Sequence, residues 1–211
     1  MLVEPFDISL EAAAFVVVDM QNDFVRVGAP LEVPDTRITI APIQRVLERF
    51  RQAGRPVVFT RFIAAPRETL LWKWSPQIYP PTNCCHRGFR RRYEDIRSER
   101  ECIAIIDELS PRPNEYVVDK FGYGAFFRTN LEDILRAERV DTVAVCGTVT
   151  QICVEETARE SFHLGFKTVV LSDAVSSFDP ELQHATLKNL EMKFGVVMDS
   201  SRFLELTAAR D

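Results

Sequence analysis

The sequence lacks any long hydrophobic run. Its longest uninterrupted apolar stretch is Ala12–Val18, far short of the roughly 20 residues that an α-helix needs to cross a bilayer. The first ten residues carry Glu4, Pro5 and Asp7, where a secretory signal peptide would carry positive charge. We therefore expect no membrane anchor, no membrane partner and no secretion.

The sequence also has no excess of positive charge. The chain has 26 Lys and Arg against 31 Asp and Glu, a formal net charge of −5 at pH 7. Proteins that bind nucleic acid neutralise phosphates with basic side chains, so we expect no nucleic-acid partner. With 46% hydrophobic and 27% charged residues, the chain has the composition of an ordinary globular protein. Its length suits one domain spanning residues 1–211.

The five cysteines follow neither an even disulfide framework nor a zinc-binding spacing. Cys84, Cys85 and His86 are consecutive, which places them badly to chelate one ion together. We therefore expect no metal and no cofactor. Free thiols fit a reducing compartment, so we expect a cytoplasmic location.

Continuous apolar runs rich in β-branched residues alternate with helical patterns. Ile43, Val46, Leu47 and Phe50 follow the i, i+3, i+4, i+7 spacing of an amphipathic helix, and Asp179-Pro180 is a typical start of another helix. Such alternation indicates an α/β fold with a buried parallel sheet. The runs expected to form strands are 14–18, 56–60, 116–118, 142–145, 168–171 and 196–198.

One segment, 68–92, breaks this alternation and is interpreted as an insertion after the second strand. Long segments of this kind are more often lids or contact surfaces than plain connections. Its arginine-rich end, 87–92, either clamps a substrate carboxylate or forms a solvated or subunit-facing helix, and we favour the helix. Trp72 and Trp74 fit a pocket wall and a subunit contact equally well.

Three reactive side chains stand where predicted strands end. Asp19 follows the first strand, Lys120 the third, and Cys153 the fourth. Ligands bind beyond the carboxyl ends of the strands in open parallel sheets. An acid, an amine and a thiol therefore share one edge of the predicted sheet.

This placement fits nucleophilic catalysis by Cys153. With Thr150 as N-cap, Cys153 lies in the first turn of a helix, where the helix dipole favours a thiolate, and the ammonium of Lys120 acts the same way. Asp19 can accept the thiol proton and return it to a leaving amine. The alternative remains open that Cys153 is a core residue, Asp19 a turn cap and Lys120 a solvated side chain.

Three motifs carry a family resemblance. They are Asp19-x-Gln21-x-Asp23-Phe24, the Lys120 segment ending in Gly124-Ala125-Phe126, and Cys146-Gly147-x-x-Thr150-x-x-Cys153-Val154-x-x-Thr157-Ala158-Arg159. In type, order and spacing the chain resembles the isochorismatase-like cysteine hydrolases from about Ala13 to Met198. The resemblance implies a single-domain Rossmann-like three-layer α/β/α sandwich with a mostly parallel six-stranded sheet.

The resemblance also implies roles for individual residues. It assigns the nucleophile to Cys153, the general base to Asp19 and the family lysine to Lys120. It places a non-proline cis peptide at Thr148–Val149. That peptide would aim the N–H of Val149, together with that of Cys153, at the oxyanion of a tetrahedral intermediate.

Departures from the family pattern narrow the expected substrate. Nicotinamidases carry an Asp-x-His metal motif after the second strand, where this chain has Thr60-Arg61-Phe62-Ile63, so neither a metal nor nicotinamide is expected. True isochorismatases cleave a vinyl ether and lack the nucleophilic cysteine, so Cys153 favours amide chemistry. Gly124 replaces the family's serine, with an effect that the sequence leaves open.

Further residues are expected to contact substrate. Phe24 and Tyr123 stand beside the proposed trio as pocket walls. Arg61, which ends a strand at the active edge, is the preferred candidate to hold an anion. The remaining candidates are Gln21, which is also expected to order the Asp19 loop, Thr148 and Trp72.

We therefore expect a metal-independent cysteine amidohydrolase that cleaves a small amide, carbamoyl or ureido compound through a thioester and releases ammonia or an amine. The chain resembles the amidohydrolase branch of the family, which includes N-carbamoylsarcosine amidase, biuret hydrolase and ureidoacrylate amidohydrolase. Relatives suggest a homodimer or homotetramer. The alternatives are a vinyl-ether hydrolase, a papain-like pairing of Cys153 with His163 or His184, and a catalytically idle oligomeric binding protein.

Overall fold

The computed structural model describes residues 6–208 and contains a six-stranded parallel sheet. The strand order is β5-β2-β1-β6-β7-β8, and the six strands that the sequence predicts are all present. The strands are β1 (Ala13–Val18), β2 (Val57–Phe62), β5 (Tyr116–Lys120), β6 (Thr142–Thr148), β7 (Lys167–Ser176) and β8 (Val196–Met198).

The central strands are apolar because both faces of the sheet are covered. Every residue of β1 and every residue of β6 is buried, as expected of a parallel sheet between two helical layers. The two strands lie side by side, with Val17 opposite Cys146 and Val18 opposite Gly147. Their carboxyl ends therefore meet at one edge of the sheet.

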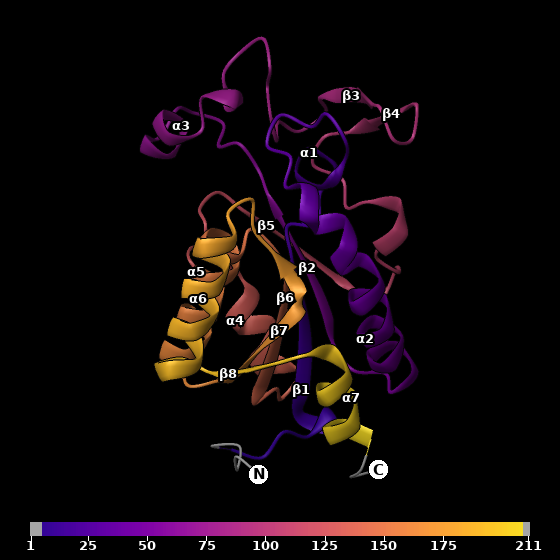
Figure 1. Ribbon diagram of the computed structural model, residues 1–211, viewed down its shortest axis with the longest axis vertical. Coiled ribbons are helices and arrows are strands. Elements are labelled where there is room, and N and C mark those ends of the chain that lie inside the picture. The colour runs from indigo at the N-terminus through magenta and orange to yellow at the C-terminus, as the bar shows by residue number, and fades with distance from the viewer. Residues whose placement is uncertain (1–5, 209–211) are drawn as a thin grey trace.

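Helices form a layer on each face of the sheet (Figure 1). On one face Phe50 stacks between Phe15 of β1 and Phe203, with ring centroids 5.4 and 6.1 Å apart. On the other face Leu135 and Leu190 pack in a second core. The first layer contains α2 (Ile40–Gln52) and α7 (Ser200–Ala208), and the second contains α4 (Leu131–Ala137), α5 (Glu155–His163) and α6 (Pro180–Lys193).

The start of α6 follows the signal in the sequence. The carboxylate of Asp179 accepts the backbone N–H groups of Glu181 and Leu182 at 2.9 and 3.0 Å, and Pro180 occupies the first helical turn. This satisfies donors that a helix N-terminus otherwise leaves without partners. Within the described residues 6–208, no helix is long and apolar enough to span a membrane.

The chain between β2 and β5 makes a long excursion, of which the expected insertion, 68–92, is one part. It contains α3 (Leu70–Trp74) and an antiparallel hairpin of β3 (Arg90–Tyr93) and β4 (Ser98–Glu101). In Figure 1 these elements and α1 (Asn22–Val25) lie at the carboxyl-end edge of the sheet. The helix expected over 87–92 is wrong, because residues 90–93 pair with residues 98–101 as strands.

Candidate active site

A buried ion pair joins the ends of β1 and β5. Lys120 Nζ lies 2.7 Å from Asp19 Oδ2, and both side chains are fully buried. Their strands are separated by β2, and Lys120 crosses the end of β2 with its Nζ 5.6 Å from the ring centroid of Phe62. The side chain of Lys120 therefore brings together two strands that are not neighbours.

Further hydrogen bonds hold the other polar atoms of Asp19 and Lys120. Thr60 Oγ1 donates to Asp19 Oδ1 at 2.7 Å and accepts the backbone N–H of Asp19 at 3.2 Å. Lys120 Nζ donates to the carbonyl oxygens of Gly122 and Tyr123 at 3.1 and 2.8 Å. Buried charges are tolerated when they are both paired and hydrogen-bonded, so both side chains are held in one geometry.

Cys153 lies beside this ion pair on a π-helical turn, Thr150–Val154, that connects β6 to α5. Its thiol is buried and interacts with both Asp19 and Lys120. Burial raises the pKa of the Cys153 thiol to about 12, since the lowering effect of Lys120 is outweighed by burial and by the Asp19 carboxylate. The thiol of Cys153 is therefore neutral near pH 7.

This finding corrects the expectation of a thiolate stabilised by a helix dipole. Thr150 does not cap the turn: Val149 precedes it as N-cap, and the buried Thr150 hydroxyl makes no hydrogen bond within the described part of the chain. For Lys120, burial opposes the charge, but the negative charge of Asp19 and the thiol of Cys153 prevail and raise its pKa. The amine therefore remains a cation.

A cavity of about 470 Å³ opens onto Cys153. Among the residues expected to touch substrate or form an oxyanion hole, Phe24, Tyr123 and Val149 line it with Cys153. The peptide bond between Thr148 and Val149 is cis, where the family resemblance places one. The other walls include Phe62, Leu71, Trp74, Ile152 and Phe178.

Arg61 lies outside the lining, which corrects its expected role in anion binding. Its Nε and Nη2 bond the two carboxylate oxygens of Asp119 at 2.7 and 3.0 Å, directly across the β2–β5 pairing. Arg87 bonds the same carboxylate at 2.6 Å. Side chains alternate between the two faces of a strand. The side chain of Arg61 lies on the face where it pairs with Asp119, away from the cavity lining.

Trp72 also lies outside the lining. It is buried, with its ring edge-on to Tyr79 and His86 at centroid distances of 5.2 and 5.5 Å. Trp74, two positions further along α3, lines the cavity instead. Side chains two positions apart on an α-helix point about 200° apart. Only one of the two tryptophans can therefore face the cavity.

Gln21 and Thr148 hold backbone and side chains around the site without lining the cavity. Gln21 Oε1 accepts the N–H of Phe62 at 2.6 Å, and its Nε2 donates to the carbonyl of Phe62 at 3.0 Å. The segment after Asp19 is thereby fixed against β2. The hydroxyl of Thr148 bonds those of Thr36 and Ser176, each at 3.2 Å.

None of the three histidines of the chain lines the cavity. His86 Nε2 bonds the carbonyl of Ile78 at 2.9 Å. His163 lies at the last turn of α5 against the ring of Phe194, and His184 is exposed on α6. The alternative of a papain-like cysteine–histidine pair is therefore wrong.

Comparisons with known proteins identify the family of the chain. The model of the Isochorismatase domain matches residues 13–202. The chain belongs to the isochorismatase family. The solved structure of a cysteine hydrolase from Pseudomonas syringae pv. phaseolicola 1448A superposes with a TM-score of 0.87 at 27% identity, covering 99% of this chain and 98% of that one.

Two further relatives have named activities. Ureidoacrylate amidohydrolase RutB of Pseudomonas syringae pv. syringae is 32% identical over 95% of this chain and 85% of its own length. The solved N-carbamoylsarcosine amidase of Thermoplasma acidophilum is 30% identical with a TM-score of 0.71, covering 89% of this chain and 96% of that one.

Gly124, which stands where the family resemblance places a serine, leaves room for a neighbouring carboxylate. A Cβ at Gly124 would fall on the carboxylate of Glu160 from α5, which accepts the backbone N–H of Phe126 at 2.8 Å. Burial, the largest influence, raises the pKa of Glu160. Sequence reasoning missed Glu160, because nothing in one sequence links a helix residue to a loop glycine.

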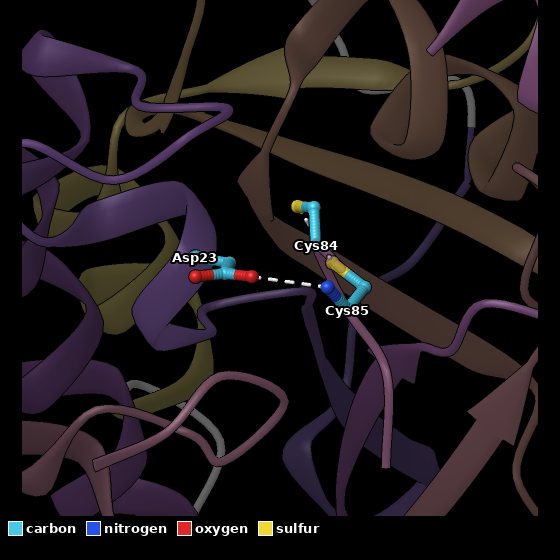
Figure 2. Close-up of side chains that lie close together, drawn as sticks. All are labelled: Asp23, Cys84 and Cys85. Carbon is cyan, nitrogen blue, oxygen red and sulfur yellow. Dashed lines mark hydrogen bonds between the residues drawn. The ribbon is translucent and has the colours of Figure 1, made fainter. Parts of the chain in front are cut away.

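A second buried cluster consists of Asp23, Cys84 and Cys85 (Figure 2). Their potential ligand atoms lie within 4.8 Å of one another, so the two cysteines are closer to a chelating arrangement than their sequence order suggested. Asp23 accepts bonds from Cys85 N, Tyr93 Oη and Arg91 Nε at 3.0, 2.7 and 3.1 Å. Because Arg91 neutralises this carboxylate, we assign the cluster a structural role.

Proposed function

We propose that this chain is a cysteine amidohydrolase that cleaves the C–N bond of a small amide, carbamoyl or ureido compound. The observation that carries the proposal is the Cys153 thiol beside the buried Asp19–Lys120 pair at the base of a cavity. Relatives named as amidohydrolases support the same bond class. They favour amide cleavage over the vinyl-ether alternative.

The proposed first half-reaction forms a thioester. The sulfur of Cys153 attacks the carbonyl carbon while its proton passes to the carboxylate of Asp19. The backbone N–H groups of Val149 and Cys153 stabilise the resulting oxyanion. Asp19 then protonates the leaving nitrogen, the C–N bond breaks, and ammonia or an amine departs.

The second half-reaction hydrolyses the thioester. Asp19 accepts a proton from water as the water oxygen attacks the carbonyl carbon, and the C–S bond then breaks, with the proton returning to Cys153. Lys120 keeps Asp19 in position and balances its charge throughout. Side chains, backbone amides and water complete both halves, so we propose a metal-independent reaction without a cofactor.

We also propose that the protein is a cytoplasmic homodimer or homotetramer. The five free cysteines support a reducing compartment. Leu70 and Trp74 of α3 are 80% and 79% exposed, and exposed apolar side chains gathered on one element are typical of contact surfaces.

The deciding experiment measures ammonia release from a panel of small amides and ureido compounds. We expect Cys153→Ala to reduce kcat by roughly three orders of magnitude or more, as loss of a nucleophile does, with an unchanged circular dichroism spectrum. Cys146→Ala serves as the matched control, since Cys146 is also buried but lies outside the cavity lining. Full activity of Cys153→Ala would refute the mechanism.

A further inference from the structure

The cavity above Cys153 is walled mostly by apolar side chains, with Ser75, Gln77 and Tyr123 as its uncharged polar members. Phe24 and Phe62 form one part of the wall, with ring centroids 6.5 Å apart. Leu71, Ile152 and Phe178 contribute further apolar surface. Among the described residues 6–208, no lysine, arginine or histidine belongs to the lining.

The one charged residue of the lining is acidic and already engaged. Glu32 Oε1 pairs with Arg37 Nη1 at 2.8 Å, and its Oε2 accepts the backbone N–H of Gly28 at 2.9 Å. A second carboxylate entering the cavity would therefore find no counter-charge in this pair. Arg37 itself lies outside the lining, where its charge is balanced by Glu32 and its Nη1 also donates to the carbonyl of Val25.

The basic groups near the site are paired and lie outside the cavity lining. Arg61 and Arg87 share the carboxylate of Asp119, which leaves one net positive charge on these three residues, but neither arginine lines the cavity. Lys120 is paired with Asp19 beneath the cavity. An anionic substituent would lose its hydration on entering and gain no counter-charge, which is costly. An apolar substituent gains about 25 cal/mol for each Å² removed from water.

We infer that the preferred substrate is an uncharged amide whose acyl group is apolar, and that carboxylate-bearing ureido or carbamoyl acids are poor substrates. This inference rests on the proposed amidohydrolase function and adds the substrate class to it. A cavity of about 470 Å³ lies within the usual range for small-molecule sites and accommodates a branched or aromatic acyl chain.

The test compares 4-methylpentanamide with succinamate, which have similar shapes because an isopropyl group in the first takes the place of the carboxylate in the second. We expect kcat/KM for 4-methylpentanamide to exceed that for succinamate roughly 100-fold or more, since burying an unpaired charge is strongly unfavourable. Equal values, or a preference for succinamate, would overturn the inference and leave the amidohydrolase function standing.

A charge placed in the wall provides a second test. Phe178 is 59% exposed and lines the cavity, whereas Phe127 is also 59% exposed but lies outside the lining. We expect Phe178→Arg to reduce the preference for 4-methylpentanamide at least about tenfold, because a guanidinium pairs with carboxylate. Phe127→Arg adds the same charge and should leave the ratio unchanged; an equal effect of both variants would contradict the proposed binding site.

Binding separates this inference from the proposed function. If neither amide is hydrolysed, the amidohydrolase proposal fails for this substrate class, and calorimetric titration of the Cys153→Ala protein still tests the cavity. Tighter binding of 4-methylpentanamide than of succinamate supports an apolar ligand site. Equal binding, tighter binding of succinamate, or no binding of either compound overturns it.

Discussion

At the scale of single residues, the site combines one buried ion pair with one neutral thiol. Lys120 and Asp19 are paired at 2.7 Å, and burial holds the pKa of Cys153 at about 12. A thiol with so high a pKa is a poor nucleophile until its proton leaves. The carboxylate of Asp19 thus has two opposed effects, since it disfavours a standing thiolate and yet can accept the proton during attack.

This dual effect can be measured by alkylation of Cys153 with iodoacetamide. The wild-type rate should keep rising with pH through pH 9, because the fraction of thiolate grows as pH approaches a pKa of about 12. Asp19→Asn removes a charge that raises the pKa of Cys153. We expect this variant to alkylate faster than wild type at pH 8 while losing amidase activity.

The matched control for this experiment is Cys153→Ala, which identifies the alkylated sulfur by mass spectrometry. A wild-type rate that levels off near pH 7 would show a thiolate already formed and contradict the prediction. Thermal unfolding of Asp19→Asn checks that its faster labelling does not come from an opened fold.

The convergence of Asp19, Lys120 and Cys153 could be predicted from the sequence, because parallel strands end at a common edge. Their catalytic roles stay predictions. The predictions that Arg61 and Trp72 contact substrate were wrong. The periodicity of a strand or helix fixes how its side chains point relative to one another. Which of them face the cavity depends on partners that are distant in sequence, such as Asp119 for Arg61.

At the scale of elements, the loop after β5 connects the ion pair to helix α5. Its carbonyls at Gly122 and Tyr123 hold Lys120 Nζ. The same loop is fixed by Glu160 of α5 through the N–H of Phe126. Gly124 leaves the space in which that carboxylate sits, so glycine and glutamate form one structural unit.

We predict that Gly124→Ala destabilises the protein by about 1–2 kcal/mol, since the displaced Glu160 loses its hydrogen bond to Phe126. Glu160→Ala removes the obstruction, so the double variant should be more stable than the sum of the two single effects predicts. Urea denaturation of all four proteins measures this coupling.

Gly122→Ala is the control in the same loop, because a Cβ there meets only a ring carbon of Phe127 at an ordinary 3.7 Å. If the changes in unfolding free energy caused by Gly124→Ala and Glu160→Ala simply add in the double variant, the proposed coupling between the two residues is contradicted. A fall in kcat with unchanged KM for Gly124→Ala would show that the disturbance reaches Lys120.

The regular elements could be predicted because their signals are local. Continuous apolar runs indicated the strands, and Asp179-Pro180 indicated α6. The β3–β4 hairpin could not be found in this way, since its strands are largely polar and gain their stability from pairing and from contacts of Arg91 and Tyr93 with Asp23. Those contacts span about 70 residues.

At the scale of the whole molecule, apolar side chains lie exposed near the carboxyl ends of the strands. Leu70 and Trp74, both on α3, are 80% and 79% exposed. Their clustering at the catalytic edge favours an oligomer whose interface lies close to the cavity mouth.

Light scattering coupled to size-exclusion chromatography tests this arrangement. We expect wild type to elute with two or four times the monomer mass and Leu70→Glu to shift toward the monomer, because a buried charge without a partner opposes association. Met192→Glu is the control, since Met192 is 65% exposed on α6 and outside the expected interface. A monomeric wild type, or an unshifted Leu70→Glu, would contradict the prediction.

The apolar cavity favours binding of the proposed amide substrate over binding of its acid product. An amide enters without charge, whereas its hydrolysis leaves a carboxylate against walls such as Phe24 and Phe62 that offer no cation. An anion in such surroundings is far more stable in water. If the substrate is an apolar amide, as we propose, the surface that binds it disfavours the acid product, and we expect accumulated acid to be a weak competitive inhibitor.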